Sequence, residues 1–161
     1  MKTEPNLRKR VKIWIIVFII GLVLSGITAF PIETELGWLA GHSSLFPQFI
    51  RDWLSGVYLA VKNTNQAYPY LAYGTDWLAF AHLVIALVFV GPLINPVKNI
   101  WVIQFGMIAC VMVFPLAFIA GPIRGIPVYW RCIDCCFGIF GIIPLYIVYL
   151  DIKKLEAIAT K

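Results

Sequence analysis

The sequence predicts an all-α integral membrane protein: a four-helix bundle with an amphipathic cap helix on the extracytoplasmic side. Hydrophobic residues make up 61% of the 161-residue chain and charged residues only 13%, against about 45–50% and about 25% in soluble proteins. The apolar residues fall in four long blocks, as membrane-spanning helices require. A further segment between the first two blocks repeats its apolar residues at helical spacing. The length leaves room for a single transmembrane domain, residues 1–161.

The first span is expected at residues 13–30, behind a short basic tail at residues 1–12. Its apolar core is longer than the roughly 7–15 residues of a signal peptide, and no A-x-A-like cleavage site follows it. We therefore interpret it as an uncleaved helix. Gly21, Ser25 and Ala29 recur every four residues and predict a stripe of small residues against a neighbouring helix.

Residues 31–76 form the predicted outer cap, which contains one amphipathic helix at about residues 45–62. Ser43 or Ser44 is expected to cap this helix, with Pro47 in its first turn. An aromatic-rich apolar face next to membrane spans is typical of a helix in the membrane interface. The apolar residues at three- and four-residue intervals are Phe46, Phe49, Ile50, Trp53, Leu54, Val57, Tyr58 and Val61.

The remaining spans are expected at about residues 77–95, 101–120 and 130–150. Pro115 and Pro144 fall inside the third and the fourth. Neighbouring helices and local adjustments satisfy the carbonyl groups that a proline leaves unbonded in a membrane helix. These prolines therefore predict kinks rather than helix ends.

The positive charges predict the orientation of the chain. Four spans place both termini on one side, and the termini with the Lys98 turn hold nine of the lysines and arginines, against four in residues 31–76 and 121–134. By the positive-inside rule the termini are cytoplasmic, in what we expect to be a bacterial inner membrane. The basic residues cluster at span ends and do not alternate with aromatic residues along a groove, so no nucleic-acid partner is expected. The expected partner is a membrane lipid or amphiphile, with a homo-oligomer or another membrane protein as alternatives.

Five ionisable residues are expected to gather near the outer surface: Asp76, His82, Arg124, Arg131 and Asp134. The predicted topology brings all five to the same side of the membrane. His82 follows Asp76 by six residues, which is about 9 Å along a helix. Ionisable groups at the membrane are costly and usually face partners inside a bundle. These five residues are the predicted ligand-binding site.

Two interpretations of this cluster remain open. In the functional one, Arg124 and Arg131 bind an anionic group through charge-assisted hydrogen bonds, and His82 with Asp76 is available for proton transfer. In the structural one, Arg131 pairs with Asp134, Arg124 pairs with Asp76, and His82 bonds a backbone carbonyl. Asp134 also lies near the expected start of the fourth helix, where an aspartate caps free N–H groups.

A group of cysteines supports an alternative function. Cys132 and Cys135 have the C-x-x-C spacing of thiol oxidoreductases,. With four spans, a long first outer loop and this motif at the start of the last helix, the chain resembles the vitamin K epoxide reductase family. The resemblance implies a quinone-linked thiol-disulfide oxidoreductase that uses Cys132 and Cys135. That family relays electrons through a cysteine pair in the first outer loop, and residues 31–76 contain no cysteine here.

Together these observations favour a small membrane protein whose outer polar site binds an anionic lipid headgroup or a small amphiphile. The sequence leaves open whether catalysis follows binding, and it identifies no cofactor. No metal-ligand spacing of histidines and carboxylates is present. The alternatives are the thiol oxidoreductase and a non-catalytic membrane partner subunit whose polar cluster holds the helices together.

Overall fold

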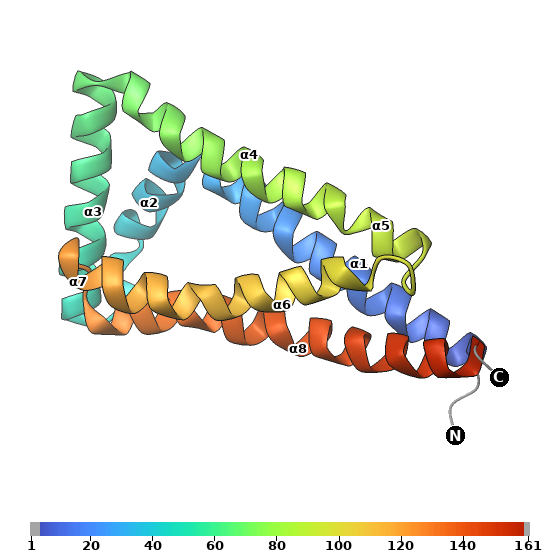
Figure 1. The fold of residues 1–161 in the computed structure, drawn as a ribbon. Helices are drawn as coiled ribbons and strands as arrows, with labels where there is room; N and C mark the ends of the chain where they lie inside the picture. Colours follow the sequence, from blue (N-terminus) through green and yellow to red (C-terminus); the bar gives the residue numbers. More distant parts are fainter. Residues whose placement is uncertain (1–3, 160–161) are drawn as a thin grey trace. The chain divides into compact units, whose positions relative to one another are not determined.

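The protein is described by a computed structural model over residues 4–159, and these residues form helices and no strand (Figure 1). Two short elements, η1 and η2, are 3-10 helices, and η3 is a π-helix. The all-α fold is confirmed. In chain order the elements are α1 (Glu4–Ala29), α2 (Ile32–Gly41), η1 (Ser43–Leu45), α3 (Gln48–Ala67), η2 (Pro69–Leu71), α4 (Ala72–Val88), α5 (Val90–Ile94), α6 (Ile100–Pro115), η3 (Leu116–Ala120), α7 (Gly121–Ile123) and α8 (Val128–Ala159).

Four helical segments are long and apolar enough to cross a membrane: Glu4–Ala29, Pro69–Ile94, Ile100–Ile123 and Val128–Ala159. About 20 apolar residues suffice to cross the hydrocarbon region. Each segment extends beyond its predicted span. In particular, the described part of the basic tail continues α1 as helix, because lysine and arginine are good helix formers.

The chain divides into two compact units, residues 1–21 with 86–161 and residues 22–85. In the first unit α6 and α8 pack side by side (Figure 1). A Cβ atom on Gly138 would lie 2.5 Å from the carbonyl oxygen of Cys110, and one on Gly106 would lie 2.8 Å from Leu145. Only glycine permits this separation, and small residues commonly bring membrane helices together in this way.

The first part of α1 adds side-chain contacts to the first unit. The ring of Phe18 lies 4.7 Å from that of Phe89, centroid to centroid. Nearer the N-terminus, Arg10 donates hydrogen bonds to both carboxylate oxygens of Asp151 on α8. Asp151 is fully buried, so this ion pair sits within the packing of the unit. The sequence did not predict this pairing.

The second unit contains α2 and α3, which pack against each other. The side chain of Asn65 donates a 2.7 Å hydrogen bond to Glu33, and a Cβ atom on Gly37 would lie 3.1 Å from the ring of Tyr58. The cap helix was predicted to begin near residue 45, but α3 begins at Gln48 with Pro47 at the N-cap and no side-chain cap. The predicted serine cap is wrong because both serines lie in η1.

The second unit also corrects the predicted small-residue stripe on α1. A Cβ atom on Gly26 would lie 2.9 Å from the carbonyl oxygen of Ala79 on α4, whereas one on Gly21 would meet no atom within 4 Å. The close approach therefore occurs at Gly26 rather than at the predicted Gly21.

Candidate functional site

A pocket of about 240 Å³ lies where the end of α6 meets the start of α8. Three of the five predicted site residues line it together with apolar side chains. All of its lining residues belong to the first unit. The lining residues are Val113, Leu116, Ala117, Ala120, Gly121, Arg124, Ile126, Arg131 and Asp134.

The π-helix η3 forms one wall of this pocket. It follows Pro115 directly, a residue that cannot donate a backbone hydrogen bond. Three of its residues, Leu116, Ala117 and Ala120, line the pocket. Single π turns inside α-helices are frequent at functional sites. The sequence predicted only a kink at Pro115, because a proline indicates that a helix is disturbed but not what geometry replaces it.

The turn after η3 holds the polar side of the pocket in place. Gly125 has a positive φ of 68°, which glycine adopts without strain. The N–H of Ile126 bonds the carbonyl of Gly121 at 2.9 Å, and that of Gly125 bonds Pro122 at 3.1 Å. This pair of bonds is the Schellman arrangement that ends helices. It gives Arg124, the residue before Gly125, a defined backbone position.

Arg131 lies across Gly121. A Cβ atom on Gly121 would be 2.3 Å from Cδ of Arg131 and 2.9 Å from its Cγ, so any larger residue would displace the arginine. Nε of Arg131 is buried and has no hydrogen-bond partner among residues 4–159. A buried polar group without a partner costs about 1–3 kcal/mol, and more when charged. Arg131 therefore lines a largely apolar pocket and keeps an unused donor that is buried.

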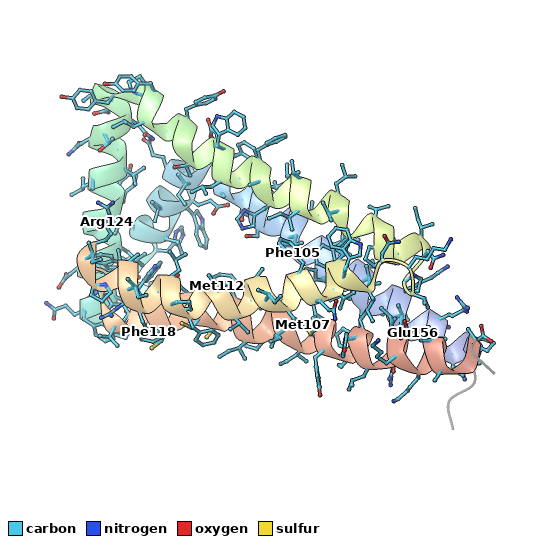
Figure 2. All side chains as sticks on the ribbon, viewed as in Figure 1. Phe105, Met107, Met112, Phe118, Arg124 and Glu156 are labelled. Carbon is cyan, nitrogen blue, oxygen red and sulfur yellow. The ribbon has the colours of Figure 1, made fainter. Side chains whose placement is uncertain are left out.

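The other two polar residues of the pocket carry opposite charges. Arg124 is exposed and Asp134 is half-buried. Figure 2 shows Arg124 and Glu156 at opposite ends of the pair formed by α6 and α8. The predicted pairing of Arg131 with Asp134 is wrong, because it is not among the ion pairs formed within residues 4–159.

The capping interpretation of Asp134 is also wrong. The fourth helix was expected to begin near residue 130, but α8 begins at Val128. The N–H groups of Trp130 and Arg131 bond the carbonyl of Pro127 at 3.1 Å, so Asp134 lies well inside the helix. Asp134 lines the pocket instead of capping the helix.

Asp76 and His82 lie on α4 in the second unit. Nδ1 of His82 lies 2.8 Å from the carbonyl oxygen of Leu78 and donates to it, since a carbonyl only accepts,. The predicted bond from His82 to a backbone carbonyl is confirmed. Nε2 is then the acceptor of the neutral ring. The predicted approach of Asp76 and His82 to the arginines, including the pairing of Arg124 with Asp76, stays a prediction.

The four cysteines are free thiols in this structure. Cys110 and Cys135 are buried, whereas Cys132 and Cys136 are exposed on α8. The thiol of Cys136 donates to the carbonyl of Cys132 at 3.3 Å. Cys132 lies just after the first turn of α8. The redox role of Cys132 and Cys135 stays a prediction.

Sequence reasoning missed Gly121 and the apolar wall of η3. The signal for Gly121 was its place in a Gly-Pro pair ten residues before Arg131, but their contact depends on how the turn folds back. Within residues 4–159, no group of three histidines, cysteines or carboxylates is arranged to hold a metal ion.

No protein-family model, curated protein or solved structure matches the chain. The function is therefore inferred from the geometry of the pocket.

Proposed function

We propose that the pocket binds the anionic headgroup of a membrane lipid or a similar amphiphile. The observation that carries the proposal is the buried, unpartnered Nε of Arg131 in a largely apolar pocket. An anionic oxygen satisfies this donor with a charge-assisted hydrogen bond, and the planar guanidinium suits phosphate and carboxylate groups. Arg124 adds a second positive charge from the turn.

The size of the pocket supports binding of a headgroup rather than of a whole lipid. Its volume of about 240 Å³ is below the range of about 300–1,000 Å³ typical of sites that enclose small molecules. An acyl chain attached to the headgroup would remain outside. Exposed apolar side chains next to the pocket, Leu116 and Ile123, provide the surface on which such a chain lies.

The orientation of the chain is part of the proposal. Four membrane-length helices and the excess of positive charge at the termini and the Lys98 turn favour cytoplasmic termini. The turn between α7 and α8 then faces the extracytoplasmic side, and the pocket takes its ligand from the outer leaflet.

Substitution of Arg131 by glutamine tests the proposal. The loss of one charged hydrogen bond, about 1.5–3 kcal/mol, should reduce retention of anionic phospholipid by about tenfold or more. Native mass spectrometry of the detergent-solubilised protein, titrated with lipid, measures this retention. Arg8→Gln is the matched control, since Arg8 is exposed and, within residues 4–159, forms an ion pair only with Glu4.

Thermal unfolding separates this proposal from a purely structural role. Removing a buried donor that has no partner should leave the unfolding temperature of Arg131→Gln unchanged or slightly raised. A lowered unfolding temperature with unchanged lipid retention would instead support the non-catalytic subunit whose polar residues hold the helices together.

A further inference from the structure

The acidic residue of the pocket restricts which headgroup fits. Asp134 lines the pocket together with Arg124 and Arg131 and forms no ion pair among the described residues. An ionised carboxylate only accepts hydrogen bonds, whereas a guanidinium only donates. The polar groups of the pocket therefore consist of two donors with positive charge and one acceptor with negative charge.

This arrangement discriminates between classes of phosphate. A phosphate monoester carries between one and two negative charges near neutral pH, and it has no hydrogen-bond donor beyond the phosphate to offer Asp134. Like charges placed together at low dielectric repel strongly. A phosphodiester carries a single charge, and a substituent beyond the phosphate with O–H or N–H groups donates to the carboxylate. Binding such a ligand satisfies Arg131 and Asp134 together.

We infer that the preferred occupant is a phosphodiester lipid whose headgroup carries a hydrogen-bond donor beyond the phosphate, such as a hydroxyl or a primary ammonium. This inference rests on the proposed function and adds the class of ligand. Arg131 and Arg124 bind the phosphate, and Asp134 accepts the hydrogen bond of the headgroup.

The test compares four lipids with identical acyl chains on the full-length protein: phosphatidylglycerol, phosphatidylethanolamine, phosphatidylcholine and phosphatidic acid. The first two carry a donor beyond the phosphate, the third is a phosphodiester without one, and the fourth is a monoester. Native mass spectrometry should show the first two retained about tenfold more strongly than the others, the ratio expected from one charge-assisted hydrogen bond. This comparison uses the unmodified chain and does not depend on how a variant folds.

Asp134→Asn then identifies the residue responsible. The amide removes the negative charge and adds a donor, so retention of phosphatidic acid should rise to the level of phosphatidylglycerol. Equal retention of all four lipids by the unmodified protein, or an unchanged order in Asp134→Asn, would overturn the inference. If Arg131→Gln still weakened every lipid, the proposed function would survive that result. If Arg131→Gln had no effect on any lipid, the proposed function would fail as well.

Discussion

Arg10 on α1 and Asp151 on α8 form an ion pair in which Nε and Nη2 of the arginine each donate to one carboxylate oxygen. The aspartate side chain is 0% exposed and the arginine side chain 31% exposed. The two partners are therefore unequal. The guanidinium of Arg10 is still partly exposed, whereas the buried carboxylate of Asp151 is compensated by Arg10. This asymmetry leads to a prediction about which substitution is worse.

Arg10→Gln should destabilise the protein more than Asp151→Asn. The first leaves an uncompensated buried carboxylate, which costs about 3–5 kcal/mol. The second leaves an arginine that is still partly exposed, so we expect a smaller loss of stability. Thermal unfolding in detergent measures both.

The double variant Arg10→Gln with Asp151→Asn should resemble Asp151→Asn alone, because the buried charge is then gone. Lys153→Gln is the control, since its ion pair with Glu156 is exposed and exposed pairs contribute little to stability. If the two single variants lost stability equally, the burial of Asp151 would not determine the cost of breaking the ion pair.

Gly121→Ala should reduce lipid retention about as strongly as Arg131→Gln. The new methyl group would lie 2.3 Å from Cδ of Arg131, so the arginine must leave its position across the turn. A helical alanine is favoured over glycine by about 0.5–1 kcal/mol, which offsets part of the strain and keeps the variant folded. Retention measured by native mass spectrometry, with unfolding temperature alongside, checks this expectation.

Gly74→Ala is the matched control for Gly121→Ala. Gly74 lies in α4, and a Cβ atom there would meet nothing within 4 Å, so lipid retention should not change. Adding Arg131→Gln to Gly121→Ala should reduce lipid retention little further, since both changes remove the interaction of Arg131 with the lipid. Wild-type retention by Gly121→Ala would mean that the position of Arg131 is irrelevant to binding.

The thiols should react in two classes. Cys132 and Cys136 are exposed, whereas Cys110 and Cys135 are buried. N-ethylmaleimide should therefore modify Cys132 and Cys136 in the folded, detergent-solubilised protein, and the buried pair only after denaturation. Intact-mass analysis before and after denaturation counts the adducts.

The thiol oxidoreductase alternative predicts a different result for the same experiment. A disulfide between Cys132 and Cys135 would protect both residues until a reductant is added. Substitution of both cysteines by serine should leave lipid retention unchanged if the pocket acts independently of them. Reduction-dependent labelling of Cys132 would contradict the free-thiol state.

Long-range regularities of the sequence predicted the fold class well. Four apolar blocks of sufficient length predict four membrane helices without knowledge of any contact, and the structure contains four helices that are long and apolar enough to cross a membrane. The helix α2 was not predicted, because two glutamates and two glycines within Ile32–Gly41 obscure its apolar positions. Helix ends were less accurate, and the misplaced start of α8 caused the wrong interpretation of Asp134 as a cap.

The candidate site was predicted in residue type but not in geometry. The sequence assigned two arginines to the outer side, where positive charge is usually scarce, and Arg124, Arg131 and Asp134 do line one pocket. The contact between Gly121 and Arg131 depends on η3 and on the turn at Gly125. The pairing of Arg10 with Asp151 joins residues far apart in the chain, and Asp151 lies just beyond the predicted end of the last span. No local pattern indicates either contact.

The division of the chain into units affects the order in which contacts form during synthesis. Residues 22–85 are contiguous, whereas the first unit combines residues 1–21 with residues 86–161. All residues of the second unit are synthesised before Asp151, the partner of Arg10, has been added to the chain. Contacts between residues far apart in sequence form slowly, so we expect the first unit to complete its contacts last. A chain that stops before Asp151 leaves the first helix permanently without this partner.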